Sequence, residues 1–359
     1  MSITKTFNKV SQHIYKLLRA TGKQYYLRKT AKENIGSGKI DNAYKKAILD
    51  YYAPYIRVNP IFHAVYYEYT GIRDVHFIPD DIFANKIDRY YNISTKAVVL
   101  ENKCYFEKMF RGVKQPITIA SRINNIWIVK DKPVKFEEIK RRITNLPVVI
   151  KQACGSGGGH DVYFLEAAEP IEHFEQTIKN IHEDIIIQKP IKQHSVLAGI
   201  NDSSVNTIRV LSMLTENGVK IYSCFLRCGR EKAKVDNASM GGLICGVDKD
   251  TGHLRDIAFS LKDYHEQFVQ HPDSGTIFKE VSIPSWEKIV ELVQIAAPQV
   301  PHSRMVAWDI TVDVNGTPVL IEANLNDSLV SAHQLVNGPI FKEDTDKILA
   351  EVFSDRSSK

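Results

Sequence analysis

Cysteine is scarce in this chain, with five cysteines in 359 residues. They are scattered, so they cannot form the disulfide framework of a small secreted domain, and this usage is typical of a reducing compartment. Cys224 and Cys228 are spaced so that their thiols could supply two of the ligands of a metal site. Because no second Cys or His pair completes such a site, we expect these thiols to fill the core.

Long apolar runs are also lacking. No stretch of about 18 apolar residues occurs, so the sequence predicts no membrane-spanning helix. Residues 1–29 lack the apolar segment and the small-residue cleavage site of a signal peptide, and we therefore expect a cytoplasmic protein. Internal repeats and low-complexity tracts are absent, and 43% hydrophobic with 25% charged residues is ordinary for a globular chain. The length allows two or three structural units.

Acidic residues are rare at the N-terminal end. Residues 1–35 hold eight Lys or Arg and one Glu, a net charge of +7, whereas the whole chain carries +5. Apolar residues between Ile3 and Leu17 recur at helical spacing. This pattern is typical of a helix that docks its apolar stripe on the body of the protein. The alternative is a basic amphipathic helix on an anionic membrane surface. Nucleic acid is not an expected partner, because no recognition motif accompanies the basic residues.

The order of the expected elements predicts an α+β protein. Residues 1–90 read as mostly helical, and strand character dominates from residue 147 onward. A hairpin of two alternating strands is predicted over 305–325, around the turn VNGT. Further helices are expected over 135–144, over 285–300 and in the C-terminal tail, and 96–110 reads as strand, turn and helix. The other strand candidates are 126–130, 147–151, 161–166, 184–191, 205–214, 220–229 and 253–259.

The segment VVIKQACGSGGGHDVYFLE, residues 148–166, places Lys151 before four glycines. A Walker loop has its lysine after the glycines, and both it and a Rossmann turn open a helix, whereas here a strand follows. The segment therefore predicts a hairpin tip whose backbone N–H groups point at phosphate oxygens, with Lys151 as a fixed positive charge. The alternative is a mobile surface hairpin with an ordinary lysine.

Three oxygen-bearing side chains are predicted to converge in the hairpin 305–325. Asp309 lies on its first strand, and Glu322 and Asn324, two apart, share one face of the second. An Asp and a Glu directed together into a poorly solvated place repel each other unless a cation joins them. Hard oxygen donors suit Mg²⁺ that also holds nucleotide phosphates. The alternative is that both carboxylates lie in water at the hairpin ends.

Arg209 lies in the middle of the expected strand 205–214, among apolar neighbours. A guanidinium group in such surroundings needs an anionic partner. A phosphate or an acyl phosphate is one candidate, and the carboxylate of a structural salt bridge is the other.

These pieces, in this order, resemble the ATP-grasp superfamily over about residues 96–330. The finer resemblance is to the sugar-transfer-associated and TupA-like branch, through SVNTIRV, WDITV…IEANLN and the D-N-x-x-x-G-G element formed by Asp236, Asn237, Gly241 and Gly242. The resemblance implies an α+β ATP-grasp fold, in which two subdomains clamp ATP between antiparallel sheets. It implies a lid subdomain over 91–190 and a core subdomain over 191–359. The helical region over 1–90 lies outside the resemblance, and we expect it to contribute to substrate or partner specificity.

The resemblance also implies roles for individual residues. Lys103, in ENKCYFEKMF, and Lys151 would contact phosphate, with Asn102 standing where the family has Asp. Arg209 would stabilise the transferred phosphoryl group, and Arg209 or Arg227 would steady the oxyanion. The loop from Arg227 to Gly242 would form part of the acceptor site. The nucleotide would be held by Gly155, Ser156, Gly157, Gly158, Gly159, Gln188, Lys189, Ile191, Asp236 and Asn237, and magnesium by Asp309, Glu322 and Asn324.

The chemistry that the resemblance implies is ATP-dependent joining of a carboxylate to an amine through an acyl phosphate. ATP and Mg²⁺ would take part, with two metal ions per site and Mn²⁺ as a substitute. An amino acid and a uronic acid or amino sugar are the expected substrates, in capsule or exopolysaccharide biosynthesis. A lipid-linked glycan would fit the basic N-terminus. The alternatives are a kinase that phosphorylates a sugar hydroxyl and a non-catalytic nucleotide-binding module.

Overall fold

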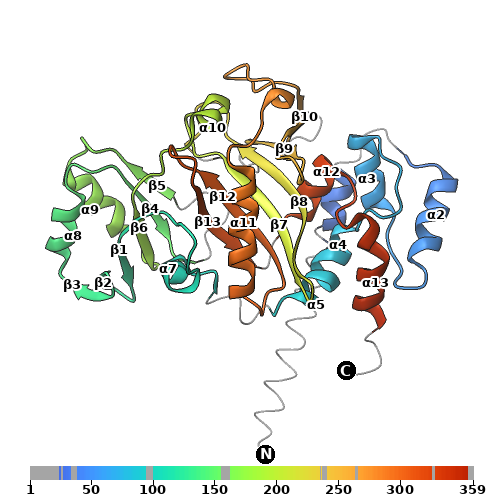
Figure 1. The fold of residues 1–359 in the computed structure, drawn as a ribbon, viewed down its shortest axis with the longest axis horizontal. Helices are drawn as coiled ribbons and strands as arrows, with labels where there is room; N and C mark the ends of the chain where they lie inside the picture. The colour runs from blue at the N-terminus through green and yellow to red at the C-terminus, as the bar shows by residue number, and fades with distance from the viewer. Residues whose placement is uncertain are drawn as a thin grey trace, which may run out of the picture. The chain divides into compact units, whose positions relative to one another are not determined.

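The computed structural model of the chain describes residues 24–25, 27–33, 39–93, 100–154, 162–234, 236, 241–262, 266–325 and 328–354 (Figure 1). Two compact units are formed, Met1–Tyr91 together with Leu329–Lys359, and Asn92–Ser328. The last helices of the chain thus belong with the first ones, and the predicted segment 191–359 runs across both units. The basic helix expected before residue 24 lies outside the described residues.

The described part of the first unit contains helices and loops and no strand. A hydrogen-bonded side chain links its two stretches of sequence: the buried amide of Gln334 accepts from Ile78 N at 2.8 Å and donates to Ile78 O at 2.9 Å. A buried backbone group needs such a partner, so this contact ties the C-terminal helices to the N-terminal ones. Besides the helical residues 27–33, the helices are α2 (Asn42–Tyr52), α3 (Ile61–Thr70), α4 (Asp80–Ile82), the π-helix η1 (Phe83–Ile87), α5 (Asp88–Tyr91), α12 (Val330–Asn337), the 3₁₀ turn η6 (Lys342–Asp344) and α13 (Thr345–Ser354).

The second unit contains a six-stranded antiparallel sheet in the order β3-β2-β1-β6-β4-β5. Helices α8 and α9 pack on one face, where Ile139, Ile143, Phe174 and Ile178 join a buried apolar cluster with the strands. In α8, acidic residues in the first turn and basic residues in the last turn complement the helix dipole. The elements are η2 (Lys103–Tyr105), α7 (Phe106–Met109), β1 (Thr118–Ile123), β2 (Ile126–Val129), β3 (Lys132–Val134), α8 (Phe136–Ile143), β4 (Val148–Gln152), β5 (Val162–Leu165), α9 (Ile171–Lys179) and β6 (Ile185–Gln188).

The same unit contains a seven-stranded sheet in the order β11-β10-β9-β8-β7-β12-β13. Its central pairs, β8 with β7, β7 with β12 and β12 with β13, are antiparallel. The elements are α10 (Ser195–Ile200), β7 (Thr207–Thr215), β8 (Gly218–Cys228), β9 (Leu243–Val247), β10 (Leu254–Ser260), β11 (Gln267–Phe268), η4 (Phe278–Glu280), α11 (Trp286–Ala296), η5 (Ala297–Gln299), β12 (Met305–Val312) and β13 (Pro318–Asn324).

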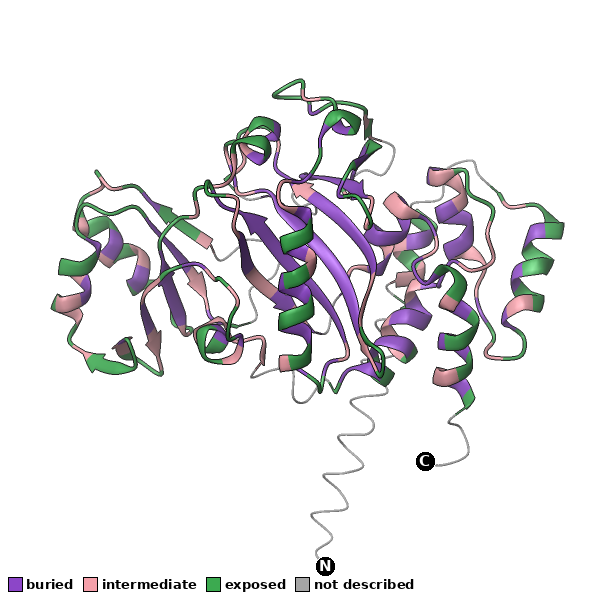
Figure 2. Cartoon of the chain, viewed as in Figure 1, coloured by how far each residue is buried: buried purple, intermediate pink, exposed green. Residues whose placement is uncertain are grey.

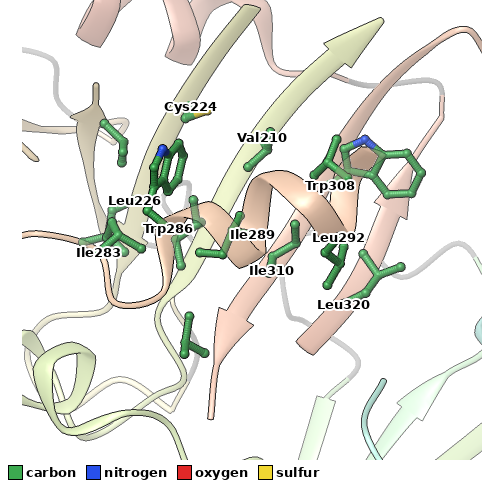
Figure 3. Close-up of a cluster of buried hydrophobic side chains, with 14 of the residues drawn as sticks. Val210, Cys224, Leu226, Ile283, Trp286, Ile289, Leu292, Trp308, Ile310 and Leu320 are labelled. Atoms are coloured by element: carbon green, nitrogen blue, oxygen red, sulfur yellow. The ribbon is translucent and has the colours of Figure 1, made fainter. Parts of the chain in front are cut away.

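Helix α11 crosses one face of this sheet and buries its apolar stripe there. Figure 3 shows Ile289 and Leu292 of the helix lying against Val210, Ile310 and other strand residues of the same buried cluster. The outward side of α11 is exposed, whereas the strands beneath it are almost wholly buried (Figure 2). The opposite face of the sheet is the one that carries the predicted site residues.

The predicted α+β class is confirmed, and most expected strands are present. Four strands, β1, β3, β9 and the two-residue β11, lie outside the segments predicted from the sequence. Strand β9 is a five-residue buried run without alternation, β3 is a three-residue edge strand containing Pro133, and β1 mixes polar and apolar residues. In the described part of the chain, no helix combines the length and the apolarity needed to cross a bilayer.

Candidate active site

A row of charged side chains crosses the face of the seven-stranded sheet opposite α11. Glu322 on β13 is the register partner of Asp309 on β12, and Asp309 is the register partner of Arg209 on β7. Side chains directly opposite each other on neighbouring strands share a face and lie close together. Trp308, the neighbour of Asp309 in the sequence, points to the α11 face (Figure 3). The strand period therefore explains why three ionic residues meet on one side.

Arg209 and Asp309 form a bidentate, buried ion pair. Arg209 Nε donates to Asp309 Oδ1 and Arg209 Nη2 donates to Asp309 Oδ2, both at 2.7 Å. The two side chains are 6% and 5% exposed. Burial alone would raise the pKa of Asp309, but the guanidinium groups of Arg209 and Arg227 outweigh it and hold this pKa below its ordinary value. In the structure, a carboxylate of the same sheet is thus an anionic partner of Arg209.

Arg227 connects this pair to Asp236. It lies opposite Thr207 in the pairing of β7 with β8. Its Nη1 donates to Asp309 Oδ2 at 3.2 Å, and its Nη2 donates to Asp236 Oδ1 at 2.9 Å. Thr207 Oγ1 donates to the other oxygen of Asp236. Thr207 was not predicted from the sequence as a site residue, although its position two residues before Arg209 places both on one face.

Lys103 joins the two sheets of the unit. Its Nζ donates to Glu322 Oε1 at 2.8 Å, and its backbone N donates to the Ala153 carbonyl at 2.9 Å, beyond the end of β4. The Lys103 side chain is 9% exposed and that of Glu322 is 30% exposed. Asn102 caps the 3₁₀ turn η2 by accepting from Cys104 N. One predicted phosphate-contacting lysine and one predicted metal ligand therefore pair with each other.

Lys151 lies on β4, opposite Val162 of β5 and Ile186 of β6. Burial and the nearby Lys103 ammonium lower the pKa of Lys151 to about 8, while Glu322 and Asp236 act in the opposite direction. Among the residues that the structure describes, Lys151 makes no ion pair. A cation held close to another cation in this way is suited to an anionic ligand. Gly155, Ser156, Gly157, Gly158, Gly159 and Asn237 lie outside the described residues.

The residues expected to hold adenine lie at the end of β6. Gln188 is buried between Thr118 of β1 and Val149 of β4. Lys189 N donates to the Ile117 carbonyl at 2.9 Å, so its N–H is already used within the fold. The Lys189 carbonyl and the half-buried Ile191 N–H are then the backbone groups that could meet a base edge, because Pro190 has no N–H.

The predicted magnesium ligands differ in how well they could receive a divalent cation. Glu322 is partly exposed and, among the residues that the structure describes, pairs with Lys103. The Asn324 amide donates to the Ala307 carbonyl at 3.1 Å, which leaves its oxygen as an acceptor. Both oxygens of Asp309 already accept from guanidinium groups. Glu322 and Asn324 thus offer the hard oxygen donors that Mg²⁺ prefers, whereas Asp309 fits less well.

Cys224 and Cys228 do not form part of a metal site in the described structure. Both are buried in the apolar cluster beneath α11, and burial raises the pKa of each thiol above its ordinary value. No group of three or more His, Cys, Asp or Glu that could hold a metal was found where side chains are described. The two thiols fill the core, as expected from the sequence.

A protein-family model described as sugar-transfer associated ATP-grasp matches residues 83–349. No curated protein matches the chain. Solved structures with similar folds include a D-alanine–D-alanine ligase from Bacillus anthracis, with 13% identity, a TM-score of 0.38, and coverage of 72% of this chain and 69% of that one. The ATP-grasp ligase PsnB with its minimal precursor has 14% identity, a TM-score of 0.41, and coverage of 73% and 64%.

A third similar structure is the biotin carboxylase domain of the 2-oxoglutarate carboxylase from Hydrogenobacter thermophilus, in complex with MgADP and bicarbonate. It has 14% identity, a TM-score of 0.41, and coverage of 72% of this chain and 46% of that one. The chain therefore spans between about half and two thirds of the length of these proteins.

Proposed function

Because the chain belongs to the sugar-transfer-associated ATP-grasp family, we propose that it is an ATP-dependent carboxylate–amine ligase. The observation that carries the proposal is the meeting of four cationic side chains around Asp309 and Glu322. Lys103 contacts Glu322, Arg209 and Arg227 contact Asp309, and Lys151 lies near enough to Lys103 to have its pKa lowered by it. Such a collection of fixed positive charge is suited to a triphosphate and to a phosphoryl group in transfer.

The chemistry follows from the weakness of a carboxylate as an electrophile, since its leaving group would be oxide. Transfer of the terminal phosphoryl group of ATP to the carboxylate gives an acyl phosphate and ADP. Attack by an amine then forms the amide and releases inorganic phosphate. Lys103 and Lys151 would bind the phosphate oxygens, and Arg209 and Arg227 would stabilise the negative charge that develops on the transferred group and on the tetrahedral oxyanion.

Glu322 and Asn324 would hold Mg²⁺, with Asp309 as the third ligand expected from the sequence. When bound, the metal would neutralise charge on the phosphates of ATP. Two ions per site, and Mn²⁺ in their place, stay predictions. The carbonyl of Lys189 and the N–H of Ile191 would recognise the adenine edge, beside Gln188. Residues 155–159 would cover the phosphates and exclude water, which would otherwise hydrolyse the acyl phosphate.

The proposed substrates are an amino acid and a uronic acid or amino sugar, in capsule or exopolysaccharide biosynthesis. The support for a sugar is the description of the family alone. A cytoplasmic location, and contact of the basic residues 1–35 with a membrane or a lipid-linked glycan, also stay predictions. Deletion of residues 1–30 should lower co-sedimentation with anionic vesicles, and unchanged sedimentation would contradict the membrane contact.

The experiment that tests the function is thermal unfolding with and without Mg·ATP, followed by product analysis. A ligand at a hundred times its Kd stabilises the folded state by about 2.7 kcal/mol, a shift of several degrees. We expect a magnesium-dependent shift in the wild type, and its loss in Glu322→Gln. The same chemical change at the exposed Glu291 on α11 is the matched control and should retain the shift.

Candidate amino acids and sugars are then supplied with ATP. ADP together with free phosphate and an amide product would support the ligase. ADP with a phosphorylated sugar and no free phosphate would favour the kinase instead. Absence of any shift, with and without candidate acceptors, would contradict nucleotide binding and favour a non-catalytic module.

A further inference from the structure

We propose that Arg230, in the loop after β8, binds a carboxylate of the second substrate that does not itself react. The inference rests on the proposed function, because it concerns the acceptor side of the same site. In the substrate-free protein, the carboxylate of Glu266 occupies the place that this ligand would take. The ligand group is either the α-carboxylate of an amino acid or the carboxylate of a uronic acid.

The first argument is the charge of the loop that carries Arg230. Residues 227–234 contain four Lys or Arg and one Glu, a net charge of +3. Within this segment, Arg227 donates to Asp236 and Asp309. Arg230 follows three residues later, beyond the end of β8, and its side chain is only 13% exposed. A guanidinium group so far removed from water needs anionic partners.

The second argument is that the carboxylates beside Arg230 use only part of its hydrogen-bonding capacity. Its Nη2 donates to Glu266 Oε2 at 2.8 Å, and the Glu266 side chain is 42% exposed. Glu231 lies 3.7 Å from Nε, beyond hydrogen-bond distance, and its side chain is 80% exposed. The Nε atom is buried and has no hydrogen-bond partner among the described residues. A ligand carboxylate in the place of Glu266 could accept from both Nε and Nη2, which is the bidentate geometry that an arginine favours.

The third argument is that the surroundings orient the guanidinium group of Arg230. Its Cζ lies 5.5 Å from the centre of the Phe268 ring, and Phe268 packs against the buried apolar cluster beneath α11. An aromatic ring holds a guanidinium group in place by a cation–π interaction. A Cβ atom at Gly241 would lie 3.9 Å from Nη2 and 4.0 Å from Nε. Gly241 therefore places no side chain on the edge of Arg230 that a carboxylate would use.

The fourth argument is that the backbone on both sides of Arg230 is fixed. The buried His271 donates from Nε2 to the Gly229 carbonyl at 2.8 Å, and Glu231 N donates to Asp273 Oδ2 at 2.6 Å. The position of Arg230 is thus set before a substrate arrives. Such preorganisation lowers the entropy that is lost on binding.

The same loop links Arg230 to the charged row on the sheet. Asp236 accepts from Arg227 Nη2 at 2.9 Å, and Gly241, five residues after Asp236, lies beside Arg230. A substrate whose reacting group lies at Arg227 could thus place a second anionic group at Arg230. The exchange of Glu266 for this group costs little, because water screens a partly exposed ion pair.

Binding of carboxylates and of their amides, with and without Mg·ADP, tests the inference. The probes are L-alanine with L-alaninamide and D-glucuronate with D-glucuronamide, because an amide replaces the carboxylate within each pair. Titration calorimetry gives the Kd of each probe. In the wild type, at least one carboxylate should bind about tenfold or more tightly than its amide, since hydrogen bonds between charged groups are the stronger ones. The pair that shows this preference identifies the source of the carboxylate.

Two substitutions should change this preference in opposite directions. Arg230→Met should reduce it to within about twofold, whereas Arg230→Lys should keep part of it, because the charge remains but the bidentate geometry is lost. Glu266→Gln should tighten carboxylate binding by about two- to fivefold, since it removes a competing partner whose screened attraction is weak. A purely structural role of the pair predicts weaker binding in both variants. Arg255→Met is the matched control and should bind the probes as the wild type does, because Arg255 on β10 also pairs with a partly exposed carboxylate, that of Asp248.

The inference would be overturned if neither carboxylate bound more tightly than its amide in either condition, or if folded Arg230→Met kept the preference. If Arg230→Met does not fold, weaker carboxylate binding by Glu266→Gln would overturn it instead. Thermal midpoints show which variants fold. The shift with Mg·ATP tests the proposed function separately. A shift without any carboxylate preference would contradict the role of Arg230 alone, whereas an Arg230-dependent preference without a shift would support the carboxylate site and contradict the ligase.

Discussion

The two faces of the seven-stranded sheet carry different kinds of side chain, although the same strands supply both. Under α11, Val210 and Trp308 belong to one buried apolar cluster. One residue away along each strand, Arg209 and Asp309 form a buried ion pair on the opposite face. The alternation of a β-strand thus places stabilising and ligand-directed residues next to each other in the sequence. The apolar face stabilises the backbone that keeps the charged groups in place.

The comparison also shows that burial has opposite consequences on the two faces. Removal of an apolar side chain from water is favourable, whereas removal of a charge is costly unless a partner accompanies it. Every carboxylate of the charged face that we have described has a cationic partner: Lys103 for Glu322, Arg209 for Asp309 and Arg227 for Asp236. Lys151 has no carboxylate partner among the described residues, so its ammonium group is suited to bind an anionic ligand.

The largest effect on stability is expected on the apolar face, from Trp308→Ala. Trp308 is fully buried, and its Nε1 donates to Ser212 Oγ at 2.8 Å. Truncation leaves a cavity and an unsatisfied hydroxyl, so the free energy of unfolding should fall by about 3–5 kcal/mol. Urea denaturation measures this loss. The Kd of the folded molecules for Mn·ADP should change by less than about twofold. A large loss of affinity with only a small loss of stability would contradict the view that the apolar face serves stability and the charged face serves binding.

The next effect is expected on the charged face, from Arg209→Met. It leaves Asp309 buried with the longer contact to Arg227 and a hydrogen bond with Asn324, and loss of one partner of a buried pair costs about 3 kcal/mol. Addition of Asp309→Leu should restore most of this stability, because no charge then remains unpaired. The thermal midpoints of the single and double variants provide the measurement. If the second substitution instead lowered the stability further, this would contradict the expectation that removing both members of the pair destabilises the protein less than removing one.

A smaller effect is expected in nucleotide affinity as a function of pH. The pKa of Lys151 is lowered to about 8 by burial and by Lys103, and a bound phosphate would raise it again. Between pH 8 and the ordinary lysine value, binding must therefore take up a proton, so the affinity for Mg·ATP should fall by up to about tenfold per pH unit above pH 8.

Calorimetry in two buffers of different ionisation enthalpy measures this proton uptake directly. Lys151→Met should bind more weakly at pH 7 and should lose the extra pH dependence. The same slope in wild type and variant would show that another group titrates.

The smallest effect is expected from a surface pair, which sets the baseline for the comparison. Arg142 and Glu138 on α8 are an i,i+4 pair at 2.7 Å with both side chains partly exposed. Glu138→Gln should change the free energy of unfolding by a few tenths of a kcal/mol, because solvent screens the attraction. If Glu138→Gln lowered the free energy of unfolding by more than Arg209→Met does, burial would not determine how strongly these two ion pairs stabilise the fold.

The hairpin 305–325 illustrates how far the sequence could predict the site. The turn VNGT and the alternation on either side predict β12 and β13, and the spacing of Glu322 and Asn324 predicts a shared face. The need of Arg209 for an anion was also readable from its apolar neighbours. The identity of that anion could not be predicted, because Asp309 is a hundred residues away in the sequence and meets Arg209 only through the pairing of β7 with β12. Strand β9 was not predicted because a short apolar run carries no period.

The sequence by itself determined the α+β class, the hairpin, the faces of its strands and the family resemblance, since these depend on residues close together in the chain. Only the tertiary structure decided the partners: Lys103 with Glu322 across 219 residues, and Arg227 with both Asp309 and Asp236. It also decided that the last helices join the first unit. The physical reason is that alternation and turn chemistry are local, whereas an ion pair depends on the register of strands that the chain brings together only when the whole sheet forms.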